Sequence, residues 1–327
     1  MTEEEDTEMT YSDAGVDIAE SEAATAALVD AVSDLEGTTA YAGLVDIGDR
    51  YLGLATDGVG TKLLVAEAVE DYSTVGIDCV AMNVNDLVAS GVTPVAFVDY
   101  LAVDEPSERL SQQVGEGLAE GASQANMALV GGETAVMPEV IQGFDLAGTV
   151  AGLATEDELI PGTAEEGDVL VGLPSSGIHS NGLTLARKAA TRDHDYTDPF
   201  PYDEDRTIGE VLLEPTRIYA DLLGPLHDHD VHAAAHVTGG GWTNLRRMGE
   251  YEYDITDPFE AQDVFAFVQK EGSVSDEEMH RTFNMGTGFV VALPESEAES
   301  FASATGGSEI GRVESGASVE IRGLSLT

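Results

Sequence analysis

The sequence is poor in cysteine, in lysine and in long apolar stretches. Cys79 is the only cysteine among 327 residues, which excludes an intrachain disulfide and a cysteine-rich metal site. No run of about 18 apolar residues occurs, and the N-terminus MTEEEDTEM lacks a basic start and an apolar stretch. We therefore expect no membrane-spanning helix and no export by that route, and we predict a cytoplasmic protein.

Basic residues are scarce in general. The chain has 14 Lys+Arg against 62 Asp+Glu, a formal net charge of −48, and only Lys62, Lys188 and Lys270 are lysines. Such a charge repels nucleic acids and anionic membranes, so we expect neither as a partner. The acids are spread through every segment, which suits concentrated salt, where screening removes self-repulsion. A calcium-binding protein would need oxygen ligands at fixed loop spacing, and no such loop is visible. We interpret the acidity as that of a halophile.

The composition predicts a globular chain of two domains. Hydrophobic residues make up 43% and charged residues 23% of the sequence, and 327 residues exceed the usual size of one domain. Strands alternate with helices in both halves, so the fold class is α/β or α+β. The segment 155–167 is acidic and contains Pro161 and Gly162. We predict a polar tail at 1–10, one domain at 11–160 and a second at 161–327.

Apolar periodicity and turn residues locate the expected elements. Helices are predicted over 18–37, 73–89, 110–125, 183–191, 216–226, 242–248 and 259–270. Strands are predicted over 50–55, 95–103, 128–130, 144–153, 168–173, 231–237 and 289–293. Residues 193–206 are predicted to form a polar surface loop.

The loop TDGVGTK (56–62) is the first candidate site. Its glycines allow close approach of the backbone to a ligand, and Lys62 could reach a phosphate. The spacing is not that of a Walker A loop, and an ordinary strand-to-helix turn is an equally good interpretation.

Acidic residues in apolar surroundings form the second candidate. On the predicted helix 73–89, Cys79, Asn83, Asp86 and Ser90 form a polar line, which a solvated face would also explain. Oxygen ligands suit Mg²⁺ bound to nucleotide phosphates, and the candidates are Asp57, Asp86 and Glu133. Asp99, within VAFVDYLAV, is assigned instead to a buried structural hydrogen bond.

Two segments of the second half resemble anion-binding loops. In GLPSSGIHSNG (172–182) and AHVTGGGWTN (235–244), a strand runs through small residues into a helix, so backbone N–H groups would face a ligand. His179 lies in the first loop, where an imidazole of near-neutral pKa could transfer a proton. Four histidines between 227 and 236 lack a zinc-binding pattern, and we interpret them as solvated or packed.

With these residues in view, the chain resembles the aminoimidazole ribonucleotide synthetase family, the phosphoribosylformylglycinamidine cyclo-ligases of purine synthesis. Matching motifs follow the family's order over nearly the full length: YSDAGVDI (11–18), ATDGVGTK (55–62), GIDCVAMNVNDLVASG (76–91), LVGGETAVMP (129–138), GLPSSGIHSNG, LEPTRIY (213–219), AHVTGGGWTN and RTFNMGTG (281–288). The resemblance implies two α/β-type domains and a homodimer whose N-terminal sheets pair. We expect the paired sheet face to carry Val95, Phe97, Leu101 and Val103, which would otherwise be an exposed apolar patch.

The resemblance also implies roles for particular residues. The acids that organise ATP and Mg²⁺ would be Asp57, Asp86 and Glu133. The loop contacting the ATP phosphates would include Gly58, Gly60, Thr61 and Lys62. The ribose phosphate of the substrate would lie against His179, Asn181, Thr238, Gly239, Gly240 and Gly241. The residues implied to be catalytic are Asp57, Lys62, Asp86 and His179.

The implied reaction is ATP-dependent ring closure of formylglycinamidine ribonucleotide to aminoimidazole ribonucleotide, with release of ADP and phosphate. ATP would phosphorylate the formyl oxygen, and an amidine nitrogen would attack that carbon and expel phosphate. The protein would position the reactants and stabilise charge on the transferred phosphoryl group.

The sequence departs from bacterial relatives in two places. Ser12 stands where they commonly carry lysine, and TTAYAGLVDIG (38–48) has only two glycines where they carry a glycine-rich segment. Because a lid over ATP would then differ in its contacts, we assign no site residue to 38–48.

Relatives that share the ATP scaffold provide the alternatives. They are formylglycinamidine ribonucleotide synthetase, selenophosphate synthetase, thiamine monophosphate kinase and the hydrogenase maturation protein. Selenophosphate synthetase usually has a reactive cysteine or selenocysteine near its N-terminus, and the hydrogenase protein a C-terminal cysteine; this chain has neither and ends GLSLT. A non-catalytic scaffold would not need Asp57, Asp86, Glu133 and His179 together.

The charge leads to a test of the halophile interpretation. Lowering KCl from about 2 M to 0.1 M lengthens the Debye screening distance to roughly 10 Å and restores self-repulsion. We expect the melting temperature to fall by about 10 °C or more, measured by circular dichroism; an unchanged melting temperature would contradict the interpretation.

Overall fold

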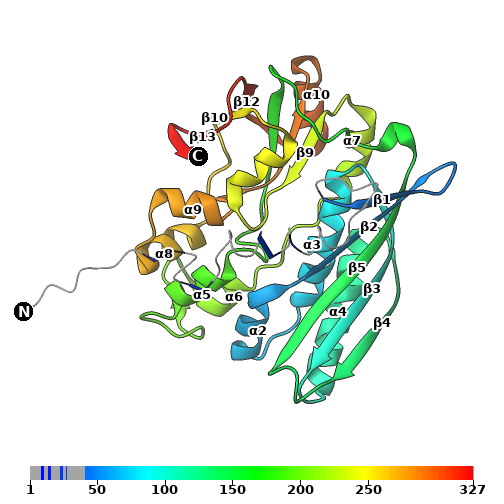
Figure 1. The fold of residues 1–327 in the computed structure, drawn as a ribbon. Coiled ribbons are helices and arrows are strands. Elements are labelled where there is room, and N and C mark those ends of the chain that lie inside the picture. The colour runs from blue at the N-terminus through cyan, green and yellow to red at the C-terminus, as the bar shows by residue number, and fades with distance from the viewer. Residues whose placement is uncertain (1–8, 11–13, 16–22, 25–26, 28–40, 327) are drawn as a thin grey trace, which may run out of the picture.

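The computed structural model describes residues 9–10, 14–15, 23–24, 27 and 41–326 (Figure 1). The helix expected over 18–37 and the tail expected over 1–10 lie outside the described residues, apart from the few positions just given. Two large sheets divide the described chain, one built from residues 43–154 and the other from residues 169–326.

The first sheet has five strands in the order β1-β2-β5-β3-β4. They are β1 (Gly43–Asp46), β2 (Tyr51–Gly58), β5 (Phe144–Ala154), β3 (Thr93–Val103) and β4 (Ala128–Val136). Only β3 and β4 pair in parallel, as expected for strands joined by a crossover helix. Strand β4 is longer than predicted, so Gly131, Gly132 and Glu133 belong to a strand and not to a loop.

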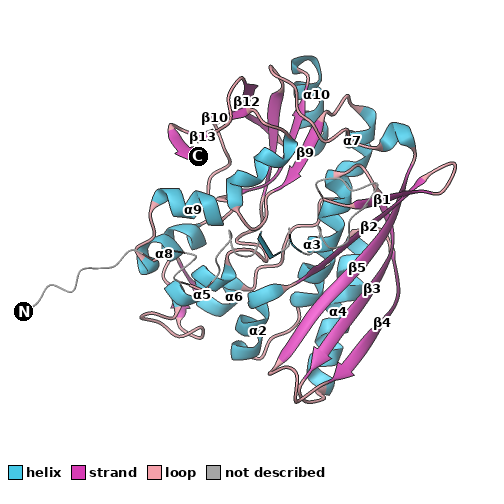
Figure 2. Cartoon of the chain, viewed as in Figure 1, coloured by secondary structure: helices cyan, strands magenta, loops and turns pink. Residues whose placement is uncertain are grey.

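Two helices cover one face of this sheet, α3 (Val75–Ala89) and α4 (Glu108–Gln124) (Figure 2). They approach so closely that a Cβ at Gly76 would overlap the backbone of residues 114–118. Glycine is therefore required at this crossing. Nearly every residue of α3 is buried, including Asp78, Asn83 and Asn85, whereas Asp86 is partly exposed. Short α2 (Leu63–Val69) continues from β2 through the 3₁₀ turn η1 (Gly60–Lys62).

The opposite face, which we call the open face, is apolar, and no described helix covers it (Figure 1). Its exposed side chains include Leu54, Val95, Val98 and Tyr100. The expectation that Phe97, Leu101 and Val103 point outward is wrong, since all three are buried on the helix side. A register shift at Val95 breaks the two-residue alternation of β3, and such a bulge reverses the side chains that follow, so Val95 and Phe97 face opposite ways.

The second sheet has seven strands in the order β14-β13-β10-β12-β6-β11-β9. They are β6 (Val169–Pro174), β9 (Ala233–His236), β10 (Glu252–Ile255), β11 (Thr287–Leu293), β12 (Ser308–Glu314), β13 (Val319–Ile321) and β14 (Leu324–Leu326). Strand β6, between β12 and β11, is buried on both faces: Leu170 packs in one apolar cluster, while Val169 and Val171 pack in another that continues into the first half of the chain.

Helices surround this sheet (Figure 2). They are α5 (Leu183–Ala190), α6 (Ile208–Leu212), α7 (Leu223–Asp228), α8 (Asp263–Gly272), α9 (Asp276–Thr282) and α10 (Glu295–Thr305), with the 3₁₀ turns η2 (Glu156–Glu158), η3 (Ala220–Leu222) and η4 (Gly241–Met248).

Two predictions for this half are wrong. The expected loop 193–206 contains a hairpin of β7 (Pro199–Phe200) and β8 (Asp203–Thr207). The expected helix 216–226 begins late, because residues 214–219 have no regular secondary structure and only η3 and α7 follow. None of the described helices is both long and apolar enough to cross a membrane.

Candidate functional site

Helix α3 presents a row of side chains to the second half of the chain. Asp78, Met82 and Asp86 are spaced four residues apart and therefore lie on one helix face. Each has a partner beyond residue 170: Asp78 contacts Thr216, Met82 contacts Asn181 and Asp86 contacts His236. The candidate site therefore forms where the two halves meet.

Asp57 is held at the end of β2. The Nδ2 group of Asn83 on α3 donates to the carbonyl oxygen of Asp57 at 3.1 Å, and the N–H of Gly58 donates to Asp57 Oδ1 at 2.7 Å. Although the residue keeps an exposed part, burial of its carboxylate raises the pKa of Asp57, and the negative charge of Asp86 raises it further. A divalent cation between the two carboxylates would relieve this repulsion, and carboxylate oxygens are ligands that Mg²⁺ accepts.

Asp86 is oriented by a histidine that the sequence analysis did not select. The Nδ2 group of Asn85 lies 3.3 Å from His236 Nε2, and since an amide nitrogen only donates, Nε2 accepts. The proton of the neutral ring is then on Nδ1, which donates to Asp86 Oδ1 at 3.3 Å. Asn85 and His236 are both fully buried, so this arrangement is fixed by packing.

Lys62 does not point toward an open site. Its side chain is fully buried, and its ammonium group donates to Asp78 Oδ1 at 2.9 Å and to the carbonyl oxygen of Glu214 at 2.6 Å. Thr61 is also engaged, its hydroxyl lying 3.0 Å from that of Thr184. The expectation that Lys62 contacts phosphate is therefore corrected. In the loop 56–62, backbone is accessible at Gly58 and Gly60, and Gly60 adopts a positive φ of 73°.

Glu133 does not join Asp57 and Asp86 within one chain. The register aligns Asp57 with Gly148, Gly148 with Asp99, and Asp99 with Gly132, so β4 is three strands from β2, about 14 Å. Glu133 pairs with Tyr100, which is exposed on the open face, and lies on that face itself. Among the described residues no cluster of three metal-ligating side chains occurs, so the three predicted acids do not meet within one chain.

His179 occupies a strained and buried position in the loop 175–182. Its φ of 65° is left-handed, which is uncommon outside glycine, and its side chain is fully buried. The N–H of Ser176 donates to His179 Nε2 at 3.1 Å, so the ring proton is on Nδ1, which has no partner among the described residues. Burial, followed by the nearby basic groups His236, Lys62 and Arg217, holds the pKa of His179 well below its ordinary value. The expected near-neutral pKa is therefore wrong.

Each of the two anion-binding candidates is anchored by a buried asparagine. The Nδ2 group of Asn244 donates to the carbonyl oxygens of Gly239 and Gly241, and that of Asn284 donates to the carbonyl oxygens of Gly177 and Ile178. Because each asparagine side chain binds the carbonyl groups on one side of its loop, the backbone N–H groups can face the opposite side. The N–H groups of Gly239 and Gly240 donate to no described residue, as an anion-binding loop requires.

The two loops adjoin each other. A Cβ at Gly239 would lie 3.5 Å from Asn181 Oδ1, so these two predicted residues lie close together. Thr238, two residues beyond the end of β9, directly precedes Gly239. Asn181 in turn contacts Met82 on α3. One side of α3 therefore carries the carboxylate Asp86, and next to it lie two loops with backbone donors. This arrangement can bind a cation-bound polyphosphate and a second phosphorylated molecule side by side.

Several residues of the site were not found from the sequence. Those missed are Asp78, Asn85, Thr216, His236, Asn244 and Asn284. A signal existed for Asp78, because its spacing from Asp86 is two helical turns. For the asparagines no local signal existed, since their partners are carbonyl groups of distant or irregular backbone.

Comparisons with known proteins match both halves. Residues 39–154 match the family model "AIR synthase related protein, N-terminal domain", and residues 165–323 match the corresponding C-terminal domain. The chain is 50% identical over 323 residues to phosphoribosylformylglycinamidine cyclo-ligase of Methanosarcina mazei, covering 95% of this chain and 97% of the relative. It is 46% identical over 304 residues to the protein of the same name from Pyrococcus horikoshii, covering 89% and 90%.

Solved structures show the same fold at low identity. AaThiL, solved in complex with AMPPCP and TMP, is similar with a TM-score of 0.69 and 16% identity, covering 95% of this chain and 96% of that one. A crystal structure of tt0281 from Thermus thermophilus is similar with a TM-score of 0.66 and 23% identity, covering 94% and 98%. These likenesses establish the architecture of the chain.

The depressed pKa of His179 predicts a pH dependence of stability. The unfolded chain takes up a proton on this residue near pH 6.5 while the folded chain does not, so stability falls as the pH drops below that value. Between pH 7.5 and 5.5 this residue should cost about 1.4 kcal/mol. Urea unfolding in molar KCl at both pH values would measure it, and His179→Gln should reduce the difference by that amount. Equal differences in the two proteins would contradict the assignment.

Proposed function

Because this chain belongs to the AIR synthase related family, we propose that it is a phosphoribosylformylglycinamidine cyclo-ligase. It converts formylglycinamidine ribonucleotide to aminoimidazole ribonucleotide with consumption of ATP. The observation that carries the proposal is the similarity to curated relatives of that name, which extends over nearly the whole of both chains. The low-identity structural neighbours share the fold and do not favour another activity.

ATP is proposed to bind in the N-terminal half of the chain, where the end of β2 lies beside α3. Gly58 and Gly60 approach its phosphates with their backbone, and Asp57 and Asp86 hold the accompanying Mg²⁺. Mg²⁺ would neutralise charge on the phosphates during transfer. Lys62 is left out of this site because its ammonium group is bound to Asp78, and Glu133 is left out because it lies on the open face.

The phosphorylated substrate is proposed to bind at the loops that contain His179 and Asn181 and Thr238–Gly241. The backbone N–H groups of Gly239 and Gly240 suit its ribose phosphate. His179 acts in this proposal as a neutral donor through Nδ1–H and not as a general base, because its Nε2 already accepts from Ser176. ATP supplies the phosphoryl group that makes the formyl oxygen a leaving group, and the chain orients the two reactants across α3.

The chain is further proposed to work in the cytoplasm as a homodimer joined through its open faces. Monomers rarely expose a contiguous apolar patch of this kind, and a two-fold axis would place the same patch on both partners. Glu133 would then lie in the interface.

An assay of the purified protein tests the activity. With formylglycinamidine ribonucleotide, ATP and Mg²⁺ in molar KCl, ADP and aminoimidazole ribonucleotide should appear in equal amounts. Asp57→Asn and Asp86→Asn should each lower kcat/KM by about 10²–10³-fold, because each removes a charge that holds the metal–nucleotide.

The matched change Asp257→Asn, at an acid whose side chain is 84% exposed, should leave kcat/KM within about twofold. Absence of aminoimidazole product, or ADP release with thiamine monophosphate instead, would reject the proposed activity. Near-normal turnover in a folded Asp57→Asn or Asp86→Asn variant would remove that acid from the site.

The dimer is tested by placing a charge on the open face. Val98 is 42% exposed there, and Val98→Glu would bury an unpaired carboxylate in the interface, weakening dimerisation by about 100-fold or more. Tyr202→Glu, at a side chain 46% exposed in the β7–β8 hairpin, is the control. Sedimentation in molar KCl should give monomer only for Val98→Glu. A wild-type monomer, or a dimeric Val98→Glu protein, would refute the arrangement.

A further inference from the structure

Residues 214–219, which we call the bridging segment, connect α6 to η3 and lie against α3 without regular secondary structure. Their backbone groups bond to side chains of the N-terminal half instead. Lys62 binds the carbonyl oxygen of Glu214, and Asp78 accepts from the N–H of Thr216 at 2.8 Å. Asn85 binds both the carbonyl oxygen of Arg217 and the N–H of Tyr219. Side chains of α3 and Lys62 therefore replace the pairing that a helix or sheet would provide.

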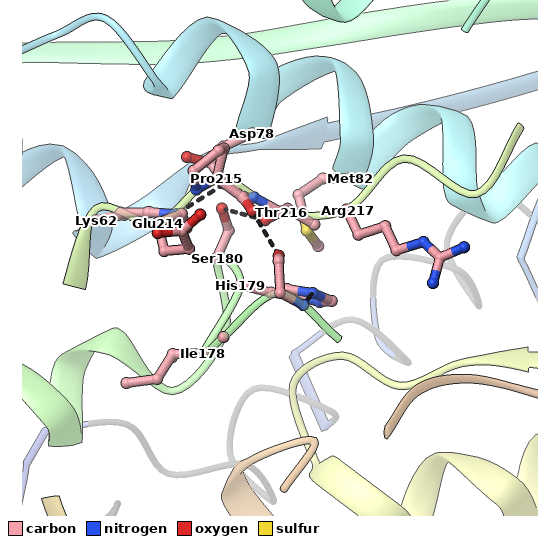
Figure 3. Close-up of polar contacts among 12 residues, drawn as sticks. Lys62, Asp78, Met82, Ile178, His179, Ser180, Glu214, Pro215, Thr216 and Arg217 are labelled. Atoms are coloured by element: carbon pink, nitrogen blue, oxygen red, sulfur yellow. Dashed lines mark hydrogen bonds and ion pairs between the residues drawn. The ribbon is translucent and has the colours of Figure 1, made fainter. Parts of the chain in front are cut away.

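Asp78 is the centre of these contacts (Figure 3). Its Oδ1 accepts from Lys62, from the N–H of Thr216 and from the Thr216 hydroxyl at 2.6 Å. Oδ2 is buried and receives no hydrogen bond from a described residue. Because Asp78 and Lys62 are fully buried, the carboxylate depends on the donors at Oδ1, two of which come from Thr216.

The other side of the bridging segment holds the loop that carries His179. The Ser176 hydroxyl donates to the carbonyl oxygen of Pro215 at 2.6 Å. The hydroxyls of Ser180 and Thr216 lie 3.4 Å apart, and since Thr216 gives its proton to the carboxylate, Ser180 must be the donor. A directed chain of hydrogen bonds therefore runs from Ser180 through Thr216 to Asp78 (Figure 3).

We propose that Asp78 and Thr216 are positioning residues that fix the His179 loop relative to the ATP-binding half. Asp78 fixes Thr216, and Thr216 fixes Ser180, the neighbour of His179. This inference rests on the proposed function, because its test measures that activity. The two residues it concerns touch neither reactant.

The contacts distinguish this role from general stabilisation. His179 has a left-handed backbone, and the serines on both sides of it, Ser176 and Ser180, are tied to the bridging segment. Loosening Thr216 therefore releases the substrate loop. Asp57 and Asp86 are held separately, by Asn83 and His236, and keep their places. The expected effect is on kcat and on the substrate KM, with the KM for ATP unchanged.

The test compares Thr216→Val with Thr216→Ser. Valine keeps the shape but removes the hydroxyl, whereas serine keeps the hydroxyl. Loss of a hydrogen bond to a charged group corresponds to about 10–100-fold, so Thr216→Val should lower kcat by that factor with the KM for ATP within twofold. Thr216→Ser should retain kcat within about threefold. The matched control is Thr305→Val on α10, whose hydroxyl bonds only local backbone, and its kcat should stay near the wild-type value.

A second variant keeps the test decisive if Thr216→Val does not fold. Ser180→Ala removes only the donor to Thr216 at a partly exposed position, and it should lower kcat by about threefold or more at unchanged KM for ATP. Wild-type kcat in both Thr216→Val and Ser180→Ala, or equal losses in the valine and serine variants at 216, would overturn the inference. A wild-type protein that makes no aminoimidazole ribonucleotide would instead reject the proposed function.

Discussion

The burial of α3 between the first sheet and the second half of the chain is the constraint on which the rest of the structure depends. A helix buried on all sides cannot leave polar side chains unpaired, because each would cost about 1–3 kcal/mol. Asp78, Asn83 and Asn85 therefore each bind backbone groups of another segment. Those bonds in turn fix the end of β2 and the bridging segment, 214–219. The site therefore lies where the buried polar side chains of α3 form hydrogen bonds with other segments.

In the site that we propose, the two halves would bind phosphate by different physical means. The N-terminal side offers carboxylates, which need a cation between them and the phosphates, and it raises the pKa of Asp57 by burial and by the proximity of Asp86. The C-terminal side offers backbone N–H groups, which bind an anion directly, and it turns them outward by holding the carbonyls with Asn244 and Asn284. Two anions can then lie side by side without sharing ligands.

Local pattern in the sequence was enough to select the β2 loop and both glycine-bearing loops as candidates, because each is a strand end followed by residues with special backbone, and to select Asp86 as an acid on an apolar helix. It failed where long-range contacts decide the outcome. A bulge at Val95 reverses β3 before Phe97, and residues 214–219 form no helix or strand because side chains of α3 bind their backbone. Lys62 is long enough to reach either a ligand or Asp78, so the sequence alone cannot choose. Glu133 was grouped with Asp57 by residue type, whereas the strand order separates them.

Replacing the Lys62–Asp78 pair by apolar side chains would cost more than replacing most buried ion pairs. A buried pair can often be exchanged for apolar side chains of similar volume without loss, because the desolvation cost disappears with the charges. Here the same exchange would remove the partners of three further groups: the carbonyl oxygen of Glu214 and the N–H and hydroxyl of Thr216. Those groups would remain buried and unpaired, and two of them are backbone atoms that no substitution can remove. The charged pair therefore serves the irregular backbone that it binds. That backbone lies between α3 and the loop that carries His179, and it bonds to both.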